Sequence, residues 1–177
     1  MHRLFVALRP PRAMREQLLS VMGGIANARW QDDGQLHVTL KYIGEVDRNR
    51  AEDVAAALGS LSFPALDLAL SGIGTFEKKG LHHALWAGVT PHDAVTALHH
   101  KVDQACASVG IPRDERAFAP HITLARMNRS TGPIDAFLEM HAGLTSSPEH
   151  FDHFILYESH MGEGGSLYEP IARYLLR

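Results

Sequence analysis

A four-residue pattern, His-x-Thr-Leu, occurs twice in this chain of 177 residues, at residues 37–40 and 121–124. Both copies lie in runs of β-branched residues and leucine, which favour strands. Because side chains alternate along a strand, His37 and Thr39 are expected on one face and the apolar tetrad residues on the other. The same alternation places His121 beside Thr123. The pattern predicts two strands that each carry an imidazole and a hydroxyl on a polar face.

The tetrads occupy matching places in a repeated order of elements. Each follows a predicted strand and a helix that opens at a proline, and each precedes a further helix and strand. The helix-opening proline precedes the tetrad histidine by 26 residues in one half and by 30 in the other. This agreement predicts a duplicated unit, whose two copies would face each other across a cleft. The alternative is that an α+β chain of this size shows such echoes without duplication.

Proline, glycine and capping residues delimit the predicted elements. The first half contains strands over 4–8, 36–43 and 66–70 and helices from 11 to 22 and over 51–58, with a break at 72–74. The second half contains strands over 84–89, 121–125 and 154–157 and helices from 91 to 110 and over 134–140. We therefore predict one α+β domain over 1–177, built from two similar halves (about 1–80 and 81–177). The fold is expected to have two pseudo-symmetric lobes, with antiparallel sheets lining a central cleft and helices outside.

Composition limits the class of protein. The formal net charge of −3 argues against nucleic-acid binding by bulk electrostatics, although a local basic groove is compatible with it. Cys106 is the only cysteine, which excludes an internal disulfide and a closed cysteine-rich metal cluster within the chain. The apolar run at 4–8 is too short for a signal-peptide core, and no run approaches a membrane span. We expect a cytoplasmic monomer that does not bind membranes.

The paired tetrads suggest acid–base chemistry on an anion. Two facing imidazoles, each titrating near neutral pH, can take and give protons in one reaction. The hydroxyls of Thr39 and Thr123 can donate hydrogen bonds to phosphate oxygens. Arg126 would add a bidentate phosphate contact. Strict alternation places Arg126 on the face opposite His121, so it reaches the cleft only if the strand ends or bulges there.

At these residues the chain resembles the two-histidine (2H) phosphoesterase superfamily, and most closely its RNA 2′,3′-cyclic phosphodiesterase or 2′-5′ RNA ligase branch. The resemblance is carried by the segments 4–8, 36–46, 85–89, 118–126, 156–159 and 168–170. The chain departs from the family pattern only at Tyr42, where phenylalanine is common, and at Ala119, where a bulkier residue is common. Neither departure touches the proposed chemistry.

The resemblance implies metal-independent hydrolysis of a ribose 2′,3′-cyclic phosphate to a 2′-phosphate, without a cofactor or a metal site. It implies that His37 is the general acid that protonates the departing 3′-oxygen and that His121 is the general base that activates water. Thr39, Thr123 and Arg126 would hold the phosphate. The residues alone leave the two histidine roles open, because the tetrads are nearly equivalent. The reverse reaction, 2′-5′ ligation to a 5′-hydroxyl, would use the same proton carriers.

Two other functions are compatible with the sequence. One is hydrolysis of another cyclic phosphodiester, such as ADP-ribose 1″,2″-cyclic phosphate, or of a 2′-5′-linked oligonucleotide. The other is a non-catalytic module that binds RNA ends. Histidines in both tetrads argue against the module, because binding alone does not require two titrating groups.

Several residues near the tetrads have both a functional and a structural interpretation. Phe76 and Phe118 are candidates for stacking on a base, or for core packing. Lys41 shares the parity of His37 and is expected either to add positive charge to the cleft or to face solvent. Trp86 is expected to be packed rather than catalytic.

The remaining histidines and the glycine run receive structural interpretations. The pairs 82–83 and 99–100 and the residues 150 and 153 lack a metal-binding spacing and are expected on the surface or in loops. The glycine-rich run 162–165 is expected to connect a hairpin rather than to bind a nucleotide.

Overall fold

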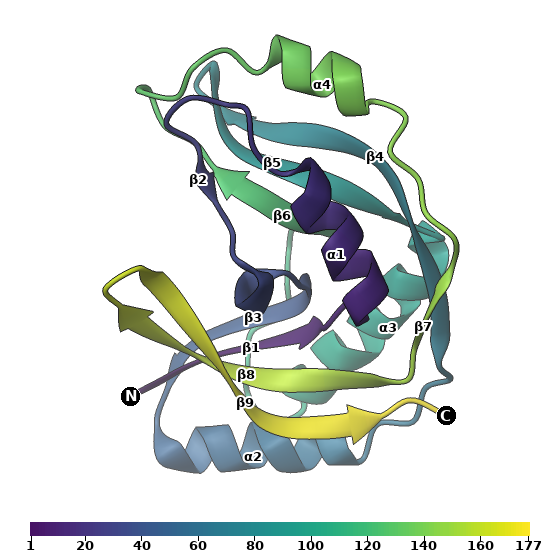
Figure 1. Cartoon of the computed structure of the whole chain (residues 1–177). Helices are drawn as coiled ribbons and strands as arrows, with labels where there is room; N and C mark the ends of the chain where they lie inside the picture. The colour runs from purple at the N-terminus through teal and green to yellow at the C-terminus, as the bar shows by residue number, and fades with distance from the viewer.

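The computed structural model describes residues 1–177 and contains nine strands, four α-helices and one 3-10 helix (Figure 1). The strands are β1 (His2–Leu8), β2 (Arg29–Trp30), β3 (Val38–Val46), β4 (Leu66–Lys78), β5 (Leu81–Thr90), β6 (His121–Arg126), β7 (Glu149–Phe151), β8 (His153–Gly162) and β9 (Gly165–Leu175). The helices are α1 (Arg12–Val21), α2 (Arg48–Gly59), α3 (His92–Ala107) and α4 (Asp135–His141), with η1 at Asp33–Gln35. None of these helices is long and apolar enough to cross a membrane.

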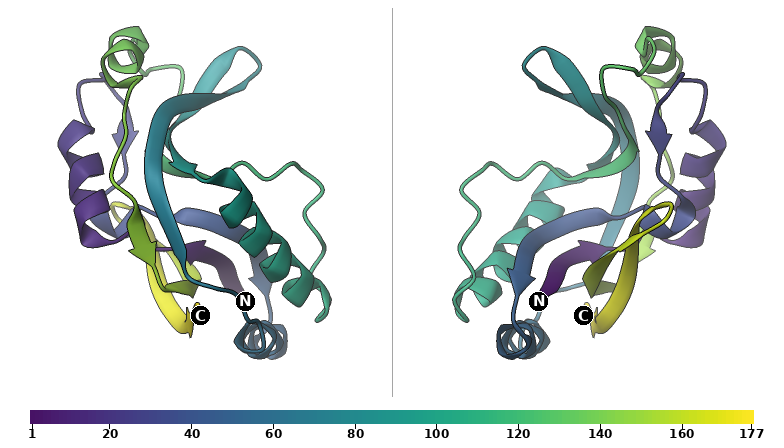
Figure 2. Two further views of the ribbon diagram at one scale, coloured as in Figure 1. Left: turned by 90° about the vertical axis from the view of Figure 1, so that its right-hand side faces the viewer. Right: turned by 90° about the vertical axis from the view of Figure 1, so that its left-hand side faces the viewer.

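The strands form one antiparallel sheet in the order β7-β4-β5-β6-β3-β1-β8-β9, and β2 pairs with β6. The sheet is nearly divided at its middle, because β3 and β6 share a single pairing, Val38 with Ile122. One lobe holds β4, β5, β6 and β7, and the other holds β1, β3, β8 and β9. Figures 1 and 2 show the lobes inclined to each other, with α4 beyond the first lobe and α2 beyond the second. The predicted α+β fold of two lobes around a cleft is confirmed.

Each lobe takes strands from both halves of the sequence. The first repeat supplies β1, β3 and β4, and the second supplies β5, β6 and β8. The pairings are equivalent, since β1 lies between β3 and β8 and β5 lies between β6 and β4. The third strand of each repeat therefore joins the other lobe. The boundary between the lobes does not coincide with a cut near residue 80.

The predicted helix signals are present where the sequence placed them. Pro11 and Pro91 directly precede α1 and α3, and the Asp47 side chain accepts the backbone N–H of Arg50 at 2.8 Å at the start of α2. Apolar helix faces join one hydrophobic core of 34 buried residues, to which α1 contributes Met14 and Leu18. A chain of this length can bury such a core as one domain.

The predicted break at Gly72 to Gly74 is wrong. β4 continues through both glycines to Lys78, and a register shift between Leu70 and Ile73 accommodates Gly72 at φ +74°. β2, β7 and β9 were not predicted, because the first two are only two and three residues long and β9 is mostly exposed. The predicted hairpin connection is confirmed, since Gly162 pairs with Gly165 at the end of β8 and β9.

A β-bulge lies at the leucine of each tetrad. On β3, Thr39 pairs with Ala7 and Lys41 pairs with Val6, so Leu40 has no partner. On β6, Thr123 pairs with Trp86 and Ala125 pairs with Leu85, so Leu124 has no partner. A bulge places two successive residues on the same side of the strand. Leu40 and Lys41 are accordingly both buried, as are Leu124 and Ala125.

Lys41 occupies neither of the two positions that the sequence suggested. Its side chain is 1% exposed, because the bulge turns it away from the cleft face and into the protein. The ammonium donates to Asp103 Oδ1 at 2.7 Å, to the Pro112 carbonyl at 2.7 Å and to Asp114 Oδ1 at 2.9 Å. Burial opposes the charge, but these acceptors prevail and raise the pKa of Lys41. Lys41 therefore joins β3 to α3 and to the loop that follows α3.

We predict that Lys41→Met lowers the free energy of unfolding by about 3–5 kcal/mol, because it leaves the buried Asp103 carboxylate without its cation. Urea denaturation monitored by circular dichroism measures the loss. The double variant Lys41→Met/Asp103→Leu should recover a large part of it, because no unpaired buried charge remains. Equal losses in the single and double variants would contradict this explanation.

Candidate active site

The polar faces of the two tetrads meet at the junction between the lobes. Val38 and Ile122 are fully buried, whereas the histidine and threonine of each tetrad are only partly buried. Extending the antiparallel Val38–Ile122 pairing by one residue in each direction places His37 opposite Thr123 and Thr39 opposite His121. The predicted sharing of faces is confirmed, and one cross-strand contact positions all four polar side chains.

The two histidines are held in the same way. His37 Nδ1 donates to the Gln35 carbonyl at 2.7 Å, and His121 Nδ1 donates to the Ala119 carbonyl at 2.6 Å. A carbonyl oxygen can only accept, so each Nδ1 carries the hydrogen and each neutral ring has an unprotonated Nε2. His37 Nε2 lies 2.9 Å from Thr39 Oγ1 and accepts from that hydroxyl. Each ring therefore has Nε2 as its proton-accepting atom.

Both imidazoles are poorer bases in the folded protein than in water. Burial lowers the pKa of His37 to about 4, and the positive charges of His121, Arg126 and Arg9 act in the same direction. Burial also lowers the pKa of His121, again with a contribution from Arg126. In each case the hydrogen bond to the backbone carbonyl opposes the shift. Both rings are therefore neutral at pH 7 in the unliganded site.

The Arg126 side chain is exposed, and its positive charge contributes to the lowered pKa of both histidines. Strict alternation would place Arg126 on the face opposite His121, but the bulge at Leu124 brings Arg126 to the same face as His121. On β3 the equivalent bulge leaves Tyr42 exposed in the place that corresponds to Arg126. The tetrads thus continue with a cation in one lobe and a phenol in the other, so the two halves of the cleft differ in charge.

Aromatic side chains that the sequence did not single out surround His37. The Phe5 ring lies 5.0 Å from the His37 ring, and Tyr168 meets His37 edge-on at 5.3 Å. Tyr157 stacks on Phe5 with ring centroids 5.1 Å apart. Along β1, residues Leu4–Leu8 are all buried, so the alternation that marks a cleft-facing residue is missing there. Burial on both faces of this strand explains why the position of Phe5 beside His37 was not predicted.

Arg9 is another site residue that the sequence did not indicate. Its Nη1 donates to the carbonyl of Leu36 at 2.9 Å and also to that of Asp33, so it fixes the backbone immediately before His37. It contributes to the lowered pKa of His37. Arg9 follows the end of β1 directly, and no local sequence signal connects it with the tetrad.

The two predicted stacking residues both line the cleft. Phe76 on β4 meets the His121 ring edge-on at 4.8 Å, and the Trp86 ring neighbours both of these rings. Gly74 makes room for Trp86, since a Cβ there would lie 2.3 Å from its ring. Phe118 stacks one face on His99 at 4.1 Å with an interplanar angle of 5°. Phe76 and Phe118 remain candidates for contact with a base.

His99 is not on the surface, in contrast to the expectation from sequence. Its side chain is buried, and Nδ1 donates to the Leu40 carbonyl at 2.6 Å. That carbonyl belongs to the bulge residue, which has no strand partner to satisfy it. His99 therefore caps the bulge beside the first tetrad.

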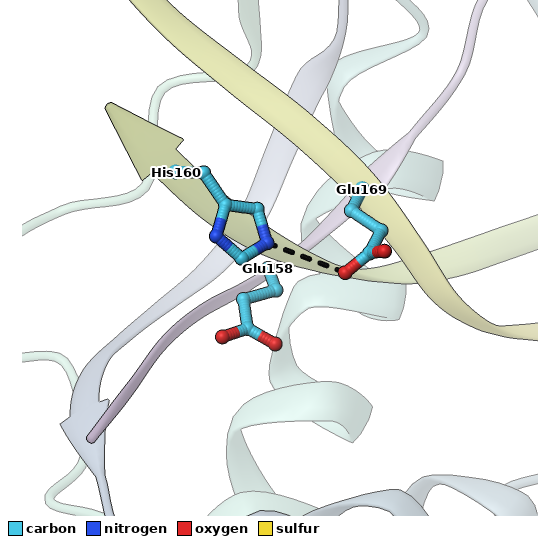
Figure 3. Close-up of side chains that lie close together, drawn as sticks. All are labelled: Glu158, His160 and Glu169. Carbon is cyan, nitrogen blue, oxygen red and sulfur yellow. Dashed lines mark hydrogen bonds and ion pairs between the residues drawn. The ribbon is translucent and has the colours of Figure 1, made fainter. Parts of the chain in front are cut away.

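A separate group of titratable side chains lies at the β8–β9 hairpin (Figure 3). His160 Nε2 lies 3.2 Å from Glu169 Oε1, and Glu158 Oε2 pairs with His2 Nδ1 at 3.0 Å. Potential ligand atoms of Glu158, His160 and Glu169 lie within 4.8 Å of one another, so the group could share a cation. Glu158 follows Tyr157 in β8 and therefore points away from the cleft. The two ion pairs account for this arrangement, which is separate from the paired histidines.

The fold and the paired histidines are those of the two-histidine phosphoesterase class. Residues 11–163 match the model of the 2′-5′ RNA ligase superfamily, and the chain belongs to this family.

The relatives include two proteins named RNA 2′,3′-cyclic phosphodiesterase. The chain is 31% identical to the one from Geobacillus stearothermophilus over 97% of its own length and 56% of that protein, so it spans little more than half of this relative. It is 24% identical to the one from Archaeoglobus fulgidus over 96% of the chain and 97% of that protein.

Solved structures share the fold over nearly the whole chain. Escherichia coli LigT, crystallised with 3′-AMP, is 25% identical, with a TM-score of 0.79 over 99% of this chain and 98% of LigT. The protein TT0787 of Thermus thermophilus is 23% identical, with a TM-score of 0.81 over 99% and 98% of the two chains, and supports the fold alone.

We predict that the ring protons of His37 titrate with a pKa of about 4 and those of His121 below 6.5 in a proton NMR titration. His37→Gln and His121→Gln assign the signals. A folded-state pKa below the unfolded value means that the unfolded chain binds more protons in this range. The two histidines thus contribute stability above pH 6.5 that is lost as the pH falls through their lowered pKa values. A His37 midpoint at or above 6.5 would contradict the desolvation argument.

Proposed function

We propose that this protein hydrolyses the 2′,3′-cyclic phosphate at the end of RNA or of a short oligonucleotide to a 2′-phosphate. The observation that supports the proposal most directly is the pair of imidazoles at the lobe junction, each with Nδ1 bonded to a carbonyl and Nε2 unprotonated. The names of the relatives supply the substrate class. We expect the protein to act as a monomer, since one chain supplies every proposed residue. A cytoplasmic location stays a prediction.

In the proposed reaction His121 Nε2 takes a proton from water, whose oxygen forms a bond to phosphorus. The bond from phosphorus to the 3′-oxygen breaks, and His37 Nε2 gives a proton to that oxygen. His37 takes up this proton from solvent when substrate binds, and His121 releases its own proton to solvent after the step, so both rings return to their neutral starting state. The residues alone do not distinguish the two roles, and this assignment follows the family.

The neutral state of His37 in the unliganded site requires that substrate binding protonate it. An anionic phosphodiester between the two imidazoles favours their charged forms and raises both pKa values. Thr39 and Thr123 flank the Val38–Ile122 pairing at the junction and would donate to the phosphate oxygens. Arg126 would hold the same oxygens through its guanidinium. In this mechanism, binding of the anionic substrate is therefore also the step that protonates His37, the general acid.

The proposed chemistry also permits 2′-5′ ligation. A 5′-hydroxyl would then take the place of water, and the two histidines would keep their proton-carrying parts. Water at its bulk concentration competes with that hydroxyl, so we expect hydrolysis to be the main reaction.

We predict that His37→Ala and His121→Ala each reduce turnover of a 2′,3′-cyclic nucleotide by about 10²–10⁴-fold, the usual effect of losing a general acid or base. The assay contains excess EDTA, and chromatography separates 2′- from 3′-phosphate products. His150→Ala, an exposed histidine on β7, serves as the control. A dominant 3′-phosphate product, or near-full activity of either tetrad variant, would refute the mechanism.

We predict that kcat/KM has an optimum on the acid side of pH 6.5. The pH profile of kcat/KM reflects the ionisation of the free enzyme. Its two limbs therefore follow the pKa of His37, about 4, and that of His121, which lies below 6.5. The optimum of kcat should lie at higher pH, because the bound anion raises both pKa values. Initial rates over a pH series at constant ionic strength measure both profiles. If the optimum of kcat lay at lower pH than that of kcat/KM, substrate binding would have lowered the histidine pKa values. That result would contradict the electrostatic argument.

A further inference from the structure

The cleft extends well beyond the histidine pair. It has a volume of about 820 Å³, near the upper end of the roughly 300–1,000 Å³ usual for small-molecule sites. Thr39 and His121 line its inner end, Phe76 lines one wall, and the loop from Pro112 to Ala119 forms another. Figure 2 shows this loop running back beside α3 from the end of that helix toward β6. The cleft thus offers more room than the cyclic phosphate and its ribose need.

The charged groups along this extension leave two cations without ion-pair partners. Lys41 is shared by Asp114 and the buried Asp103, and Glu77 Oε1 lies 3.3 Å from His82 Nε2. Arg113 and Arg116 both line the cleft, and neither has an ion pair or hydrogen bond to another side chain. The residues that line the cleft include three cations, Lys41, Arg113 and Arg116, and three carboxylates, Glu77, Asp114 and Glu115, so their formal charges balance. The feature that suits an anion is therefore local, namely the two guanidinium groups without partners, and not an excess of positive charge over the whole wall.

The loop is fixed at both ends although most of it is exposed. Near its start, the buried Lys41 ammonium holds the Pro112 carbonyl and the Asp114 carboxylate. Near its end, Phe118 stacks on the buried His99 ring. These anchors hold the loop beside the catalytic pair, because its last residue supplies the carbonyl that orients His121. Arg113 and Arg116 therefore project from a tethered wall of the site.

We propose that this loop wall is a second nucleotide subsite, in which Arg113 and Arg116 bind the phosphodiester backbone of the nucleotides that precede the cyclic end. The inference rests on the proposed function and narrows its substrate class to oligonucleotide ends. Guanidinium groups suit phosphate recognition, and the neighbouring Phe118 and Phe76 rings offer faces or edges to a base. The cyclic phosphate binds at the tetrads, and the chain leading to it follows the loop.

The test compares wild-type protein, Arg113→Ala/Arg116→Ala and the charge-matched control Arg12→Ala/Arg48→Ala. The control arginines are exposed on α1 and α2 in i,i+4 ion pairs. Substrates are 2′,3′-cyclic AMP and a hexa-adenylate with the same cyclic end. Fluorescence anisotropy measures binding of a 5′-fluorescein hexa-adenylate that ends in a 2′-phosphate, over a series of salt concentrations.

The loop variant should lower the ratio of kcat/KM for the hexamer to that for 2′,3′-cyclic AMP by roughly tenfold. It should also weaken hexamer binding and reduce the slope of log Kd against log salt by about 1.4, for two phosphate contacts on a single strand. The control should match wild type in both measurements. An unchanged ratio and affinity, or an equal loss in the control, overturns the subsite. Lack of turnover by the wild type refutes the proposed function, and the anisotropy comparison then still decides whether the subsite exists.

Discussion

The whole site depends on one backbone contact, the pairing of Val38 with Ile122. It is the only ladder position that β3 and β6 share, and it lies at the centre of the sheet. Both side chains are buried completely, so hydrophobic packing holds the contact while the residues on either side turn their polar groups to the cleft. A longer β3–β6 ladder would hold the lobes in a continuous sheet at this point. A single pairing lets the lobes diverge and leaves the two histidines at the base of an open cleft.

The bulges at the tetrad leucines give the halves different chemistry from similar sequences. A change of face after each bulge brings Arg126 to the cleft and takes Lys41 into the interior. The interior cation is tolerable because Asp103, Asp114 and a carbonyl surround it. In the second repeat the same position is the small, buried Ala125. One local distortion thus yields an exposed guanidinium on the tetrad face in one lobe and a structural ion cluster in the other.

The lowered histidine pKa values follow from the same architecture. Two imidazoles at the base of a cleft lose water, and Arg126 adds positive charge close to both. Hydrogen bonds from Nδ1 to the carbonyls of Gln35 and Ala119 keep Nε2 available to substrate. Both imidazoles are therefore neutral bases at pH 7, with the positive charge of Arg126 close to them.

The sequence by itself determined the repeat, the strand character of both tetrads, the shared face of each histidine and threonine, and the family. Those features are local, because alternation and turn chemistry act over a few residues. Only the tertiary structure decided that the third strand of each repeat joins the other lobe and that bulges redirect Arg126 and Lys41. It also decided that Phe5, Arg9 and Tyr168 lie around His37 and that the loop after α3 borders the site. These arrangements arise from pairing and packing between segments far apart in the chain, and a single sequence contains no periodic signal for such contacts.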